Sequence, residues 1–549
     1  MNPRLKKLST WLPVIIALTF IAGMWSARIF TSMTSRNSGN DKLSSVIELI
    51  GNEYVDEVDI DSLLEMTYPQ LLANLDPHST YIPAADLQSV NDELEGSFSG
   101  IGITFTMLND SITVLEVLSG GPSEKVGLLP GDRIVTINDS VASGRNWSNE
   151  KVMKNLRGEK GSLVKLGIKR STSASILPYE VVRGDIPVTS IDAAYIIEPS
   201  VGYIKVNKFG RNTYSEFLTS MVELKSKGAK RFIVDLRGNG GGFMEPAILM
   251  ANEFLPAERL IVATRGRTEE GNSVTGSDGR GSFQEDELIV LIDEYSASAS
   301  EIFAGAIQDN DRGLILGRRS FGKGLVQQQT MLPDSSAIRL TVARYYTPSG
   351  RCIQKIYRPG GSTDYNNELL DRYSHGELYN ADSIKIDRSL AFSTMAGRTV
   401  YGGGGIIPDV FIPNDTTGVS SYYINIANAG LLQKFAFEYC DNNRVALSGC
   451  RTVADVLRRM PSDDALIQSF ADFAARNKIP TRWYYINISQ KLIVNQLKAL
   501  ICRDALSTPA FYEVYNTTDN AVQQALKEFK AGHAGFPLLP DGKRDGVSK

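Results

Sequence analysis

The chain has 549 residues, 42% hydrophobic and 22% charged, a globular composition that allows about three or four domains. A net charge of -4 at pH 7, without a cluster of arginine and aromatic residues, argues against nucleic-acid binding. The four cysteines have neither CxxC spacing nor companion histidines, which argues against a zinc site. Cys440 and Cys450 can pair in an oxidising compartment, and the sequence leaves that disulfide open.

The first 35 residues have the pattern of a membrane signal anchor. A largely apolar run from Trp11 to Phe30 follows three basic residues, Arg4, Lys6 and Lys7. A run of about twenty apolar residues can span a bilayer, and basic residues before it keep that end in the cytoplasm. Because no small-x-small cleavage site is evident, we expect a transmembrane helix within residues 1–35 in preference to a cleaved signal peptide. Either alternative places the rest of the chain outside the cytoplasm.

Two smaller segments follow the anchor. Residues 41–95 have helical periodicity, broken by the turn sequence NLDPHSTY, and a further helix is expected to begin near Pro83. Residues 96–184 read as a compact unit of short strands and turns. Its SGIGI sequence before a strand is typical of modules whose loop amides hold a C-terminal carboxylate while the peptide adds to the sheet edge. The candidate peptide-binding residues are Ser99, Gly100, Ile101, Gly102 and Ile103.

The largest predicted domain covers residues 185–414. Its strands alternate with helices, which predicts an α/β core with a site at the carboxyl ends of the strands. A polar insertion at about residues 358–389 interrupts this core, and residues 415–549 are expected to form a helical C-terminal extension. The predicted fold class is therefore a multidomain α/β protein.

The sequence EYSASASEIFAGA, which begins at residue 294, has two interpretations. Ser298 and Glu301 match a capping box, and such a pattern most often only starts a helix. Alternatively, Ser298 is a nucleophile that needs a base. None of the three histidines, His78, His375 and His533, lies in the predicted core, which argues against a Ser-His-Asp triad. A neutral lysine is the recognised substitute for histidine as this base.

Lys323, in GRRSFGKGLVQQQ, is the candidate base. A lysine of pKa about 10.4 is neutral about once in 2,500 at pH 7, whereas burial that lowers the pKa by about three units leaves roughly a quarter neutral. The alternative interpretation is a solvated loop lysine. The segment from Gly317 to Lys323 also matches the start of a phosphate-binding loop, but Gly324 replaces the required Ser or Thr and a β-like run follows. Phosphate binding is therefore disfavoured.

A glycine-rich segment, DLRGNGGG from Asp235 to Gly242, follows one predicted strand and precedes a helix. Three consecutive glycines let backbone amides converge on one point, as an oxyanion hole requires. A flexible turn is the alternative. Proximity to the serine stretch, at the end of a neighbouring core strand, favours the functional interpretation.

Taken in order, these motifs match a known family. LDPHSTY, the SGIGI module, DLRGNGGG, SASASEIFAGAIQD, GRRSFGKGLVQ and GGIIPD occur in this order between residues 41 and 414. In this the chain resembles the carboxyl-terminal processing peptidases, or tail-specific proteases, which combine a PDZ domain with a Ser-Lys protease core. The resemblance implies a PDZ domain at residues 96–184 and a core of the ClpP/crotonase-like type at residues 185–414.

The resemblance also implies roles for single residues. Ser298 would be the nucleophile, Lys323 its general base, and Gln327 the side chain that orients the lysine. The oxyanion would be held by the amide of Ala299 and one from the glycine loop, with Gly241 and Gly242 as the candidates. No metal or cofactor is implied.

The family plan further implies protein substrates with apolar C-terminal tails, bound by the PDZ domain. With the N-terminal helix in the inner membrane, the bulk of the chain would lie in the periplasm of a bacterial envelope, or be secreted if the signal is cleaved. The extension at residues 415–549 exceeds the minimal family plan and would dock a partner, build a homo-oligomer or cover the active site. The alternative function is an inactive PDZ scaffold, which the intact Ser298, Lys323 and Gln327 argue against.

Overall fold

A computed structural model of the chain describes Thr19 and residues 38–533, except 109, 119, 171 and 172. The predicted anchor at residues 1–35 thus lies, but for Thr19, outside the described residues. In the part that is described, no helix is long and apolar enough to cross a membrane. Residues 1–74 form one compact unit and residues 75–549 another.

The first unit contains two described helices, α2 (Ser38–Glu53) and α3 (Ile60–Ala73). They are separate because Asp59 caps the start of α3, where its carboxylate accepts hydrogen bonds from the N–H groups of Asp61 and Ser62. The helical periodicity of this segment is confirmed, whereas the break between the two helices was not predicted.

The second unit begins with the predicted turn. Asp76 accepts hydrogen bonds from the N–H groups of His78 (2.8 Å) and Ser79 (2.9 Å). A short strand that was not predicted, β1 (Thr80–Ile82), follows the turn, and α4 (Ala84–Glu95) begins after Pro83 as expected. The strand forms because it pairs antiparallel with β18 (Ala337–Tyr346).

A strand-rich module follows α4. Its sheet has the order β3-β4-β5-β7-β8, so β3 (Ile103–Leu108) is an edge strand. A ribbon of β2 (Ser97–Gly100) and β9 (Gly184–Pro187) joins the module's entry to its exit, with Ser97 opposite Pro187. The other elements of the module are β4 (Ser111–Val117), α5 (Pro122–Lys125), β5 (Arg133–Ile137), β6 (Ser140–Val141), α6 (Asn149–Leu156), β7 (Leu163–Lys169) and β8 (Leu177–Val182).

The α/β core is built on a six-stranded sheet of order β10-β11-β12-β15-β16-β21. All neighbours are parallel except β10 and β11, and the parallel strands are almost continuously buried, as sheets covered on both faces require. The strands are β10 (Ile191–Glu198), β11 (Val201–Val206), β12 (Arg231–Asp235), β15 (Glu287–Ile292), β16 (Leu314–Gly317) and β21 (Val410–Phe411).

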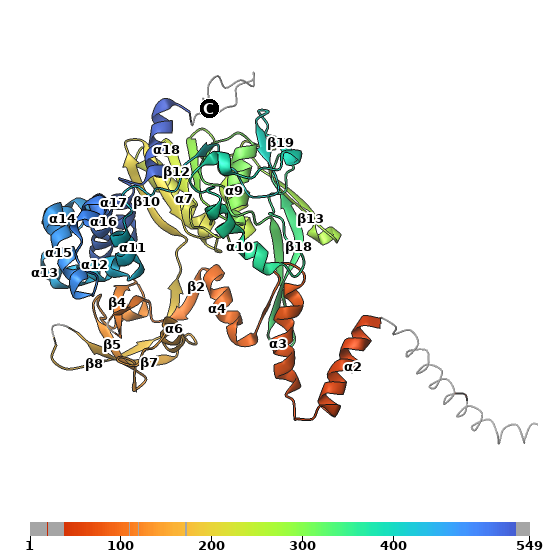
Figure 1. Cartoon of the computed structure of the whole chain (residues 1–549), viewed down its shortest axis with the longest axis horizontal. Coiled ribbons are helices and arrows are strands. Elements are labelled where there is room, and N and C mark those ends of the chain that lie inside the picture. Colours follow the sequence, from red (N-terminus) through yellow and green to blue (C-terminus); the bar gives the residue numbers. More distant parts are fainter. Residues whose placement is uncertain (1–18, 20–37, 109, 119, 171–172, 534–549) are drawn as a thin grey trace, which may run out of the picture. The chain divides into compact units, whose positions relative to one another are not determined.

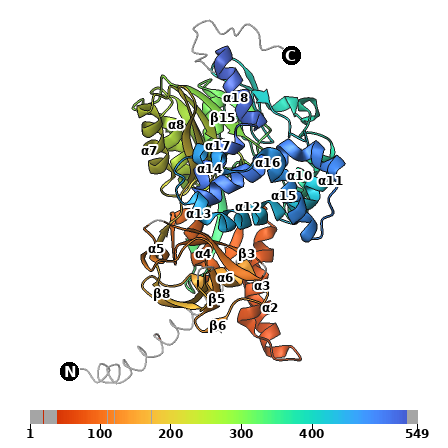
Figure 2. The same cartoon turned by 90° about the vertical axis from the view of Figure 1, so that its left-hand side faces the viewer.

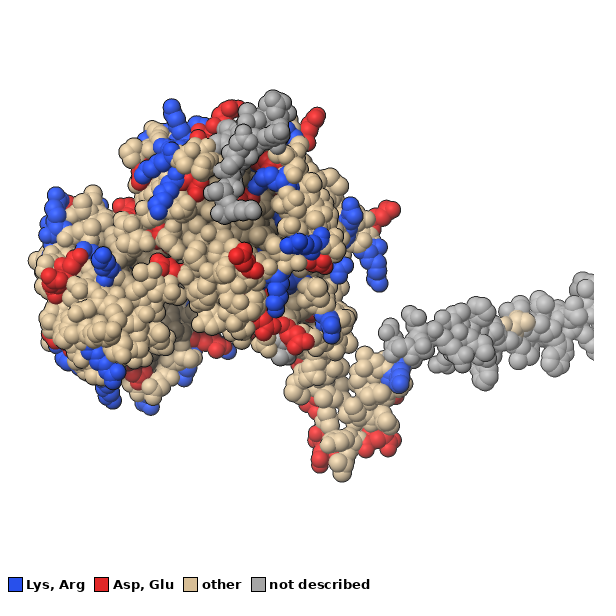
Figure 3. All heavy atoms as spheres, turned by 45° about the horizontal axis from the view of Figure 1, so that its top comes forward, with Lys and Arg blue, Asp and Glu red and all other residues tan. Residues whose placement is uncertain are grey.

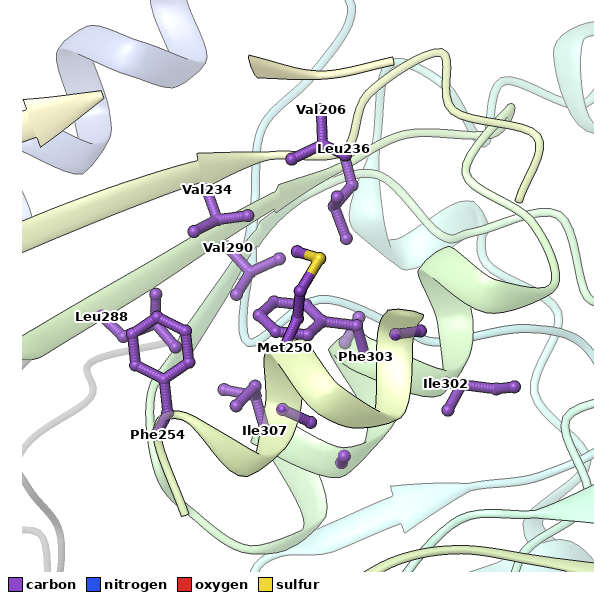
Figure 4. Close-up of a cluster of buried hydrophobic side chains, with 14 of the residues drawn as sticks. Val206, Val234, Leu236, Met250, Phe254, Leu288, Val290, Ile302, Phe303 and Ile307 are labelled. Atoms are coloured by element: carbon purple, nitrogen blue, oxygen red, sulfur yellow. The ribbon is translucent and has the colours of Figure 1, made fainter. Parts of the chain in front are cut away.

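Three helices cover one face of this sheet: α7 (Thr213–Ser226), α8 (Met244–Asn252) and α9 (Ala299–Asp309). Figure 4 shows Met250 of α8 and Phe254, two residues after that helix, beside Phe303 and Ile307 of α9, packed against strand residues such as Val234. Each is essentially excluded from solvent, and such burial stabilises the fold by roughly 1.5–3 kcal/mol per side chain. The packing fixes the starts of α8 and α9 at the carboxyl end of the sheet.

A second sheet, of order β1-β18-β13-β14 with β17 also paired to β18, flanks the core. It contains β13 (Leu260–Gly266), β14 (Ser273–Gly276) and β17 (Leu325–Met331). The predicted polar insertion is not a detached loop, because α10 (Ser362–Ser374) packs back onto the core through the fully buried Arg372. Its guanidinium donates to the backbone oxygen atoms of Ser320 and Phe321. A small hairpin of β19 (Ala391–Ser393) and β20 (Thr399–Tyr401) follows.

The C-terminal extension is helical, as expected. Its first six helices and α17 share a hydrophobic cluster of their own, whereas α18 covers the second face of the core sheet (Figures 1 and 2). Cys440 and Cys450 are free thiols in the structure, and Sγ of Cys440 lies 3.6 Å from the carbonyl oxygen of Ile501. The helices are α11 (Ser421–Asn428), α12 (Leu431–Asn442), α13 (Arg444–Leu447), α14 (Val453–Arg459), α15 (Asp463–Arg476), α16 (Trp483–Ala505), α17 (Thr508–Tyr515) and α18 (Asn520–Ala531).

Acidic and basic side chains are interspersed on the face shown in Figure 3. The chain contains 58 Lys and Arg and 62 Asp and Glu, so the two signs nearly balance. A nucleic-acid-binding protein would concentrate positive charge on one face. On the face that Figure 3 shows, neither sign of charge dominates.

Candidate active site

Ser298 lies where the chain passes from β15 into α9. It is the N-cap residue of α9, with φ 57° and ψ -113°, a backbone conformation that costs a non-glycine residue of order 1–3 kcal/mol. The capping-box pair with Glu301 is present, and Oε2 of Glu301 accepts from the N–H of Ser298 at 2.8 Å. The predicted helix start is therefore confirmed, and it presents Ser298 at the positive end of a buried helix.

The glycine loop contacts this serine directly. Gly241 has φ 99°, and a Cβ atom there would lie 2.7 Å from Cβ of Ser298, so a side chain would separate the loop from the serine. The flanking serines join the two segments: Ser296 Oγ donates to the carbonyl of Leu236 and Ser300 Oγ to that of Asn239, each at 2.9 Å. The approach predicted from DLRGNGGG and EYSASASE is thus present.

The backbone amides around Ser298 differ in their hydrogen bonds. The N–H of Gly241 donates to Oδ1 of Asn239 at 2.9 Å, so it is occupied within the loop. The N–H groups of Gly242 and Ala299 donate to no residue that the structure describes, and both residues line the cavity next to Ser298. Of the candidate oxyanion donors, Ala299 and Gly242 are therefore the available pair.

Lys323 and Gln327 meet as the four-residue spacing suggested. Nζ of Lys323 donates to Oε1 of Gln327 at 3.1 Å, and Nε2 of Gln327 donates to the backbone carbonyl of His78. This second contact fixes which end of the amide faces the lysine. The LDPHSTY segment therefore contributes a main-chain oxygen to the site, which residue types could not reveal.

The surroundings of Lys323 favour its neutral form. Burial lowers the pKa of Lys323 below its usual value, the positive charge of Arg339 lowers it further, and the acidic Glu301 and Asp76 oppose this shift. Among described residues, no carboxylate forms an ion pair with Lys323. The solvated-lysine alternative does not fit a side chain in this position.

His78 is no competing base, although it lies near the lysine. Burial, and the charge that Lys323 carries when protonated, lower the pKa of His78 to about 4, so its ring accepts a proton only weakly at pH 7. Nε2 of the ring is 2.8 Å from the hydroxyl of Tyr365 on α10. The predicted turn role of His78 is confirmed.

Glu301 links the two candidate catalytic residues, a role that sequence reasoning missed. Its Oε2 accepts from the N–H groups of both Ser298 and Lys323 at 2.8 Å, and its Oε1 accepts from the N–H of Gly322 (2.7 Å) and from Ser320 Oγ. All four partners are donors, which suits an ionised carboxylate. Burial raises the pKa of Glu301, and these hydrogen bonds oppose that rise.

Tyr345 on β18 makes a second link. Its buried hydroxyl lies 3.1 Å from the carbonyl of Ser298 and 2.7 Å from that of Lys323. Side-chain and main-chain bonds therefore hold the backbones of the candidate nucleophile and base together. No local motif marks this tyrosine, since it lies forty-seven positions after the serine.

Ser298 and Lys323 open into one cavity of about 360 Å³. Its walls combine polar groups with the apolar side chains of Phe243, Met244, Ile302 and Leu325, a mixture that ligand-binding pockets share. Asn91 and Glu95 of α4 also line it, and Glu95 is held by Arg211 (2.8 and 2.9 Å). All lining residues precede position 346, so none of the described residues of the C-terminal extension lines this cavity.

The predicted peptide-binding residues line a second cavity, of about 320 Å³, between β3 and α6. Gly100, Ile101, Gly102 and Ile103 contribute to its wall, but Ser99 does not. Phe98 and Gly100 on either side of it do line the cavity, and alternation along β2 turns Ser99 to the other face. Since β3 is an edge strand, its outer side can accept a further strand. The α6 side of the groove is formed by Asn149, Met153, Leu156 and Arg157.

A metal site and a phosphate-binding loop each have a recognisable arrangement of residues. The described residues contain no group of three or more His, Cys, Asp and Glu that can hold a metal ion. The segment from Gly317 to Lys323 is followed by strand β17, whereas a phosphate-binding loop leads into a helix.

Comparison with known proteins gives three matches to family models. Residues 200–365 match Peptidase family S41, residues 99–176 match the PDZ domain, and residues 422–507 match a family of unknown function, DUF8443. The module between β2 and β9 is thus a PDZ domain. The third match falls within the C-terminal extension.

The alignments of this chain with two relatives cover most of each relative's length. The carboxy-terminal-processing protease of Bartonella bacilliformis is 37% identical over 352 residues, which cover 61% of this chain and 80% of that protein. The carboxy-terminal processing protease CtpB of Bacillus subtilis is 32% identical over 359 residues, covering 64% and 73%. Among solved structures, the photosystem II D1 C-terminal processing protease is 24% identical with a TM-score of 0.33, covering 68% and 92%.

Proposed function

Because the chain belongs to the family of carboxyl-terminal processing peptidases, we propose that it is a serine endopeptidase that uses Ser298 as nucleophile and Lys323 as general base. The observation that carries this proposal is the shared acceptor: one oxygen of Glu301 binds the backbone N–H groups of both residues at 2.8 Å. Such a link holds a nucleophile and a base side by side in one cavity.

In the proposed mechanism, Ser298 Oγ attacks the carbonyl carbon of the scissile peptide bond while neutral Lys323 takes its proton. The amides of Ala299 and Gly242 donate to the oxyanion that forms. Lys323 then returns the proton to the leaving amine, which leaves an acyl ester on Ser298. Water, deprotonated by the same lysine, hydrolyses this ester and frees the enzyme. Gln327 keeps Nζ of Lys323 oriented throughout through their 3.1 Å contact.

We further propose that the PDZ domain selects substrates by their C-terminal tails. The free edge of β3 offers backbone groups to an extended peptide, and the groove beside it accepts the last apolar side chains. The amides near Gly102, which has φ 77°, are placed to hold the terminal carboxylate. The proposed location is a bacterial envelope, with residues 1–35 as anchor, and this rests on the sequence pattern alone.

A non-catalytic PDZ scaffold is the alternative function, and one experiment separates the two. The full chain is incubated with a peptide that ends in an apolar residue with a free carboxylate, and with the same peptide amidated at its C-terminus. We expect mass spectrometry to show internal cleavage of the free-acid peptide and slower cleavage of the amide. Binding of the free acid without any cleavage would support the scaffold instead.

Replacing Glu301 by glutamine should damage both stability and activity. In the variant, the amide NH₂ would face N–H groups that donate to a carboxylate oxygen in the wild type. Each donor left without an acceptor lowers the free energy of unfolding by about 1–3 kcal/mol. A displacement of the nucleophile by about 1 Å costs about 100-fold in kcat. Urea unfolding and peptide cleavage measure the two effects.

Glu253→Gln is the matched control for Glu301→Gln. Glu253 is likewise a buried carboxylate that accepts hydrogen bonds, two in its case, but it lies outside the cavity wall. Equal kcat in both variants would contradict the role given to Glu301.

Replacing Arg339 by glutamine should move the pH profile of cleavage toward alkaline pH. Activity requires neutral Lys323, so it rises as pH passes the lowered pKa of this lysine. Removing the positive charge of Arg339 raises that pKa, and the acid limb of kcat/KM moves with it. Arg339→Lys keeps the charge and should keep the limb in place. An unshifted limb in Arg339→Gln would rule out this electrostatic effect.

A further inference from the structure

Four charged side chains form a cluster where β12 leads into the glycine loop: Lys205, Asp235, Arg237 and Asp519. Asp235 accepts from Arg237 Nη2 (2.7 Å) and lies 3.4 Å from Nζ of Lys205. Arg237 in turn donates from Nη1 to both carboxylate oxygens of Asp519, each at 3.0 Å. The side chains are 1–18% exposed, so these charges interact with little screening by water. Two acids and two bases make the cluster neutral.

Asp519 comes from the C-terminal extension and not from the core. It is the N-cap of α18, where Oδ1 also accepts from the N–H of Val522 at 2.9 Å. The helix is held on the sheet by a buried apolar face that includes Leu526 and Phe529, packed with Ile233 and Leu291 of the strands. The carboxylate of Asp519 is thus presented to Arg237 from a helix docked against the core.

Arg237 is the third residue of DLRGNGGG, so whatever holds it also holds the loop. Its carbonyl accepts from Lys205 Nζ, and the next N–H, that of Gly238, donates to Asp293 at 2.9 Å. Asn239 follows, and its carbonyl accepts from both Ala297 N–H (3.0 Å) and Ser300 Oγ (2.9 Å) on either side of Ser298. Asp519 is therefore joined to the segment that carries the nucleophile by its hydrogen bonds to Arg237, by the backbone from Arg237 to Asn239, and by the hydrogen bonds that the Asn239 carbonyl accepts.

We propose that Asp519 is a positioning residue for the glycine loop, and that α18 is thereby an internal part of the catalytic apparatus. The inference rests on the proposed peptidase function, since the loop is assigned there as the donor of an oxyanion contact. Asp235 ends β12 only two positions before Arg237, so Asp519 is the carboxylate that ties Arg237 to an element distant in the sequence. Without its charge the cluster carries one net positive charge, and an uncharged amide at this position leaves Nη1 of Arg237 one acceptor oxygen in place of two.

The test replaces Asp519 by asparagine in the full chain. Asparagine caps a helix as well as aspartate does, so α18 keeps its start while the carboxylate charge is lost. We expect kcat to fall about tenfold with KM unchanged within about twofold, as for an interaction that acts on the transition state. A peptide boronate, whose adduct with a serine is tetrahedral and anionic, should lose affinity by the same factor, while a non-reactive product peptide should not.

Lys530→Gln is the matched control, because it breaks the exposed ion pair between α18 and Glu198 (3.0 Å) without touching Arg237. Its kcat should equal that of the wild type. Asp519→Glu keeps the charge and should recover part of the lost kcat. If Asp519→Asn does not fold, Asp519→Glu supplies the test. We then expect a kcat below that of the wild type together with a circular dichroism spectrum equal to that of the wild type.

Two failures are distinguishable. A wild-type chain that neither cleaves peptide nor binds the boronate would overturn the proposed function itself. A wild type that does both, with Asp519→Asn showing the same kcat and boronate affinity, would overturn only the role of Asp519. A fall in melting temperature alone, with kcat retained, would count against the inference as well, because a purely structural contact predicts that result.

Discussion

Replacing Ser298 by alanine should remove turnover, with kcat reduced by about 10⁴-fold or more. The change deletes only the Oγ atom that attacks the substrate, and alanine meets the same backbone cost at φ 57° as serine does. Binding of a C-terminal peptide should remain, because the PDZ groove lies in another domain. Product formation followed by mass spectrometry, with peptide affinity measured in parallel, checks both halves of this expectation.

Ser300→Ala is the matched control for this experiment. It removes the same atom two positions further on and with it the 2.9 Å bond to the carbonyl of Asn239. A lost buried hydrogen bond lowers the free energy of unfolding by about 1 kcal/mol, so Ser300→Ala should be somewhat less stable but should still turn over substrate. Cleavage by Ser298→Ala at the rate of the wild type would show that another group is the nucleophile.

Replacing Lys323 by alanine should lower kcat by about 10³-fold, within the range that a general base contributes. Lys323→Arg should be nearly as inactive, because a guanidinium keeps its proton at any usable pH and cannot act as a base. In the wild type, kcat/KM should rise with pH through the lowered pKa of Lys323, whereas the residual rate of Lys323→Ala should lack that limb. Initial rates across a pH series measure the difference.

Lys355 provides a control of the same residue type. It is also buried, and burial likewise lowers its pKa, but its Nζ pairs with Glu368 at 3.1 Å and lies over the ring of Phe321. Lys355→Met should keep the pH limb of the wild type. Full activity in Lys323→Ala would refute the assignment of the base while leaving Ser298 untouched.

The sequence could predict those parts of the site that residue type and order encode. Ser298 follows a buried strand and starts a helix, and Lys323 lies in a loop between two glycines. Gln327 lies four positions after Lys323, and the structure joins the two side chains by a hydrogen bond of 3.1 Å. The strands and helices of the core follow from their apolar periodicity. These features depend on short stretches of chain, which is why pattern reasoning recovers them.

What the sequence could not predict depends on contacts between distant segments. Glu301 is recognisable as a capping residue, but nothing local shows that its carboxylate also binds Lys323 N–H twenty-two positions later. The acceptor on His78 is a main-chain carbonyl, which every residue possesses. Asp519 looks like an ordinary N-cap until the docking of α18 places it against Arg237. Tertiary packing decides all three.

The ribbon of β2 and β9 has a consequence for how the molecule can change. Ser97 faces Pro187 and Gly100 faces Gly184, so the chain leaves the core and returns to it at a single point. In topological terms the PDZ domain is an insertion with one attachment. The PDZ domain and its peptide-binding groove can therefore be exchanged or deleted by cutting the chain at two neighbouring points, in β2 and β9. The rest of the chain keeps the same path through the catalytic core.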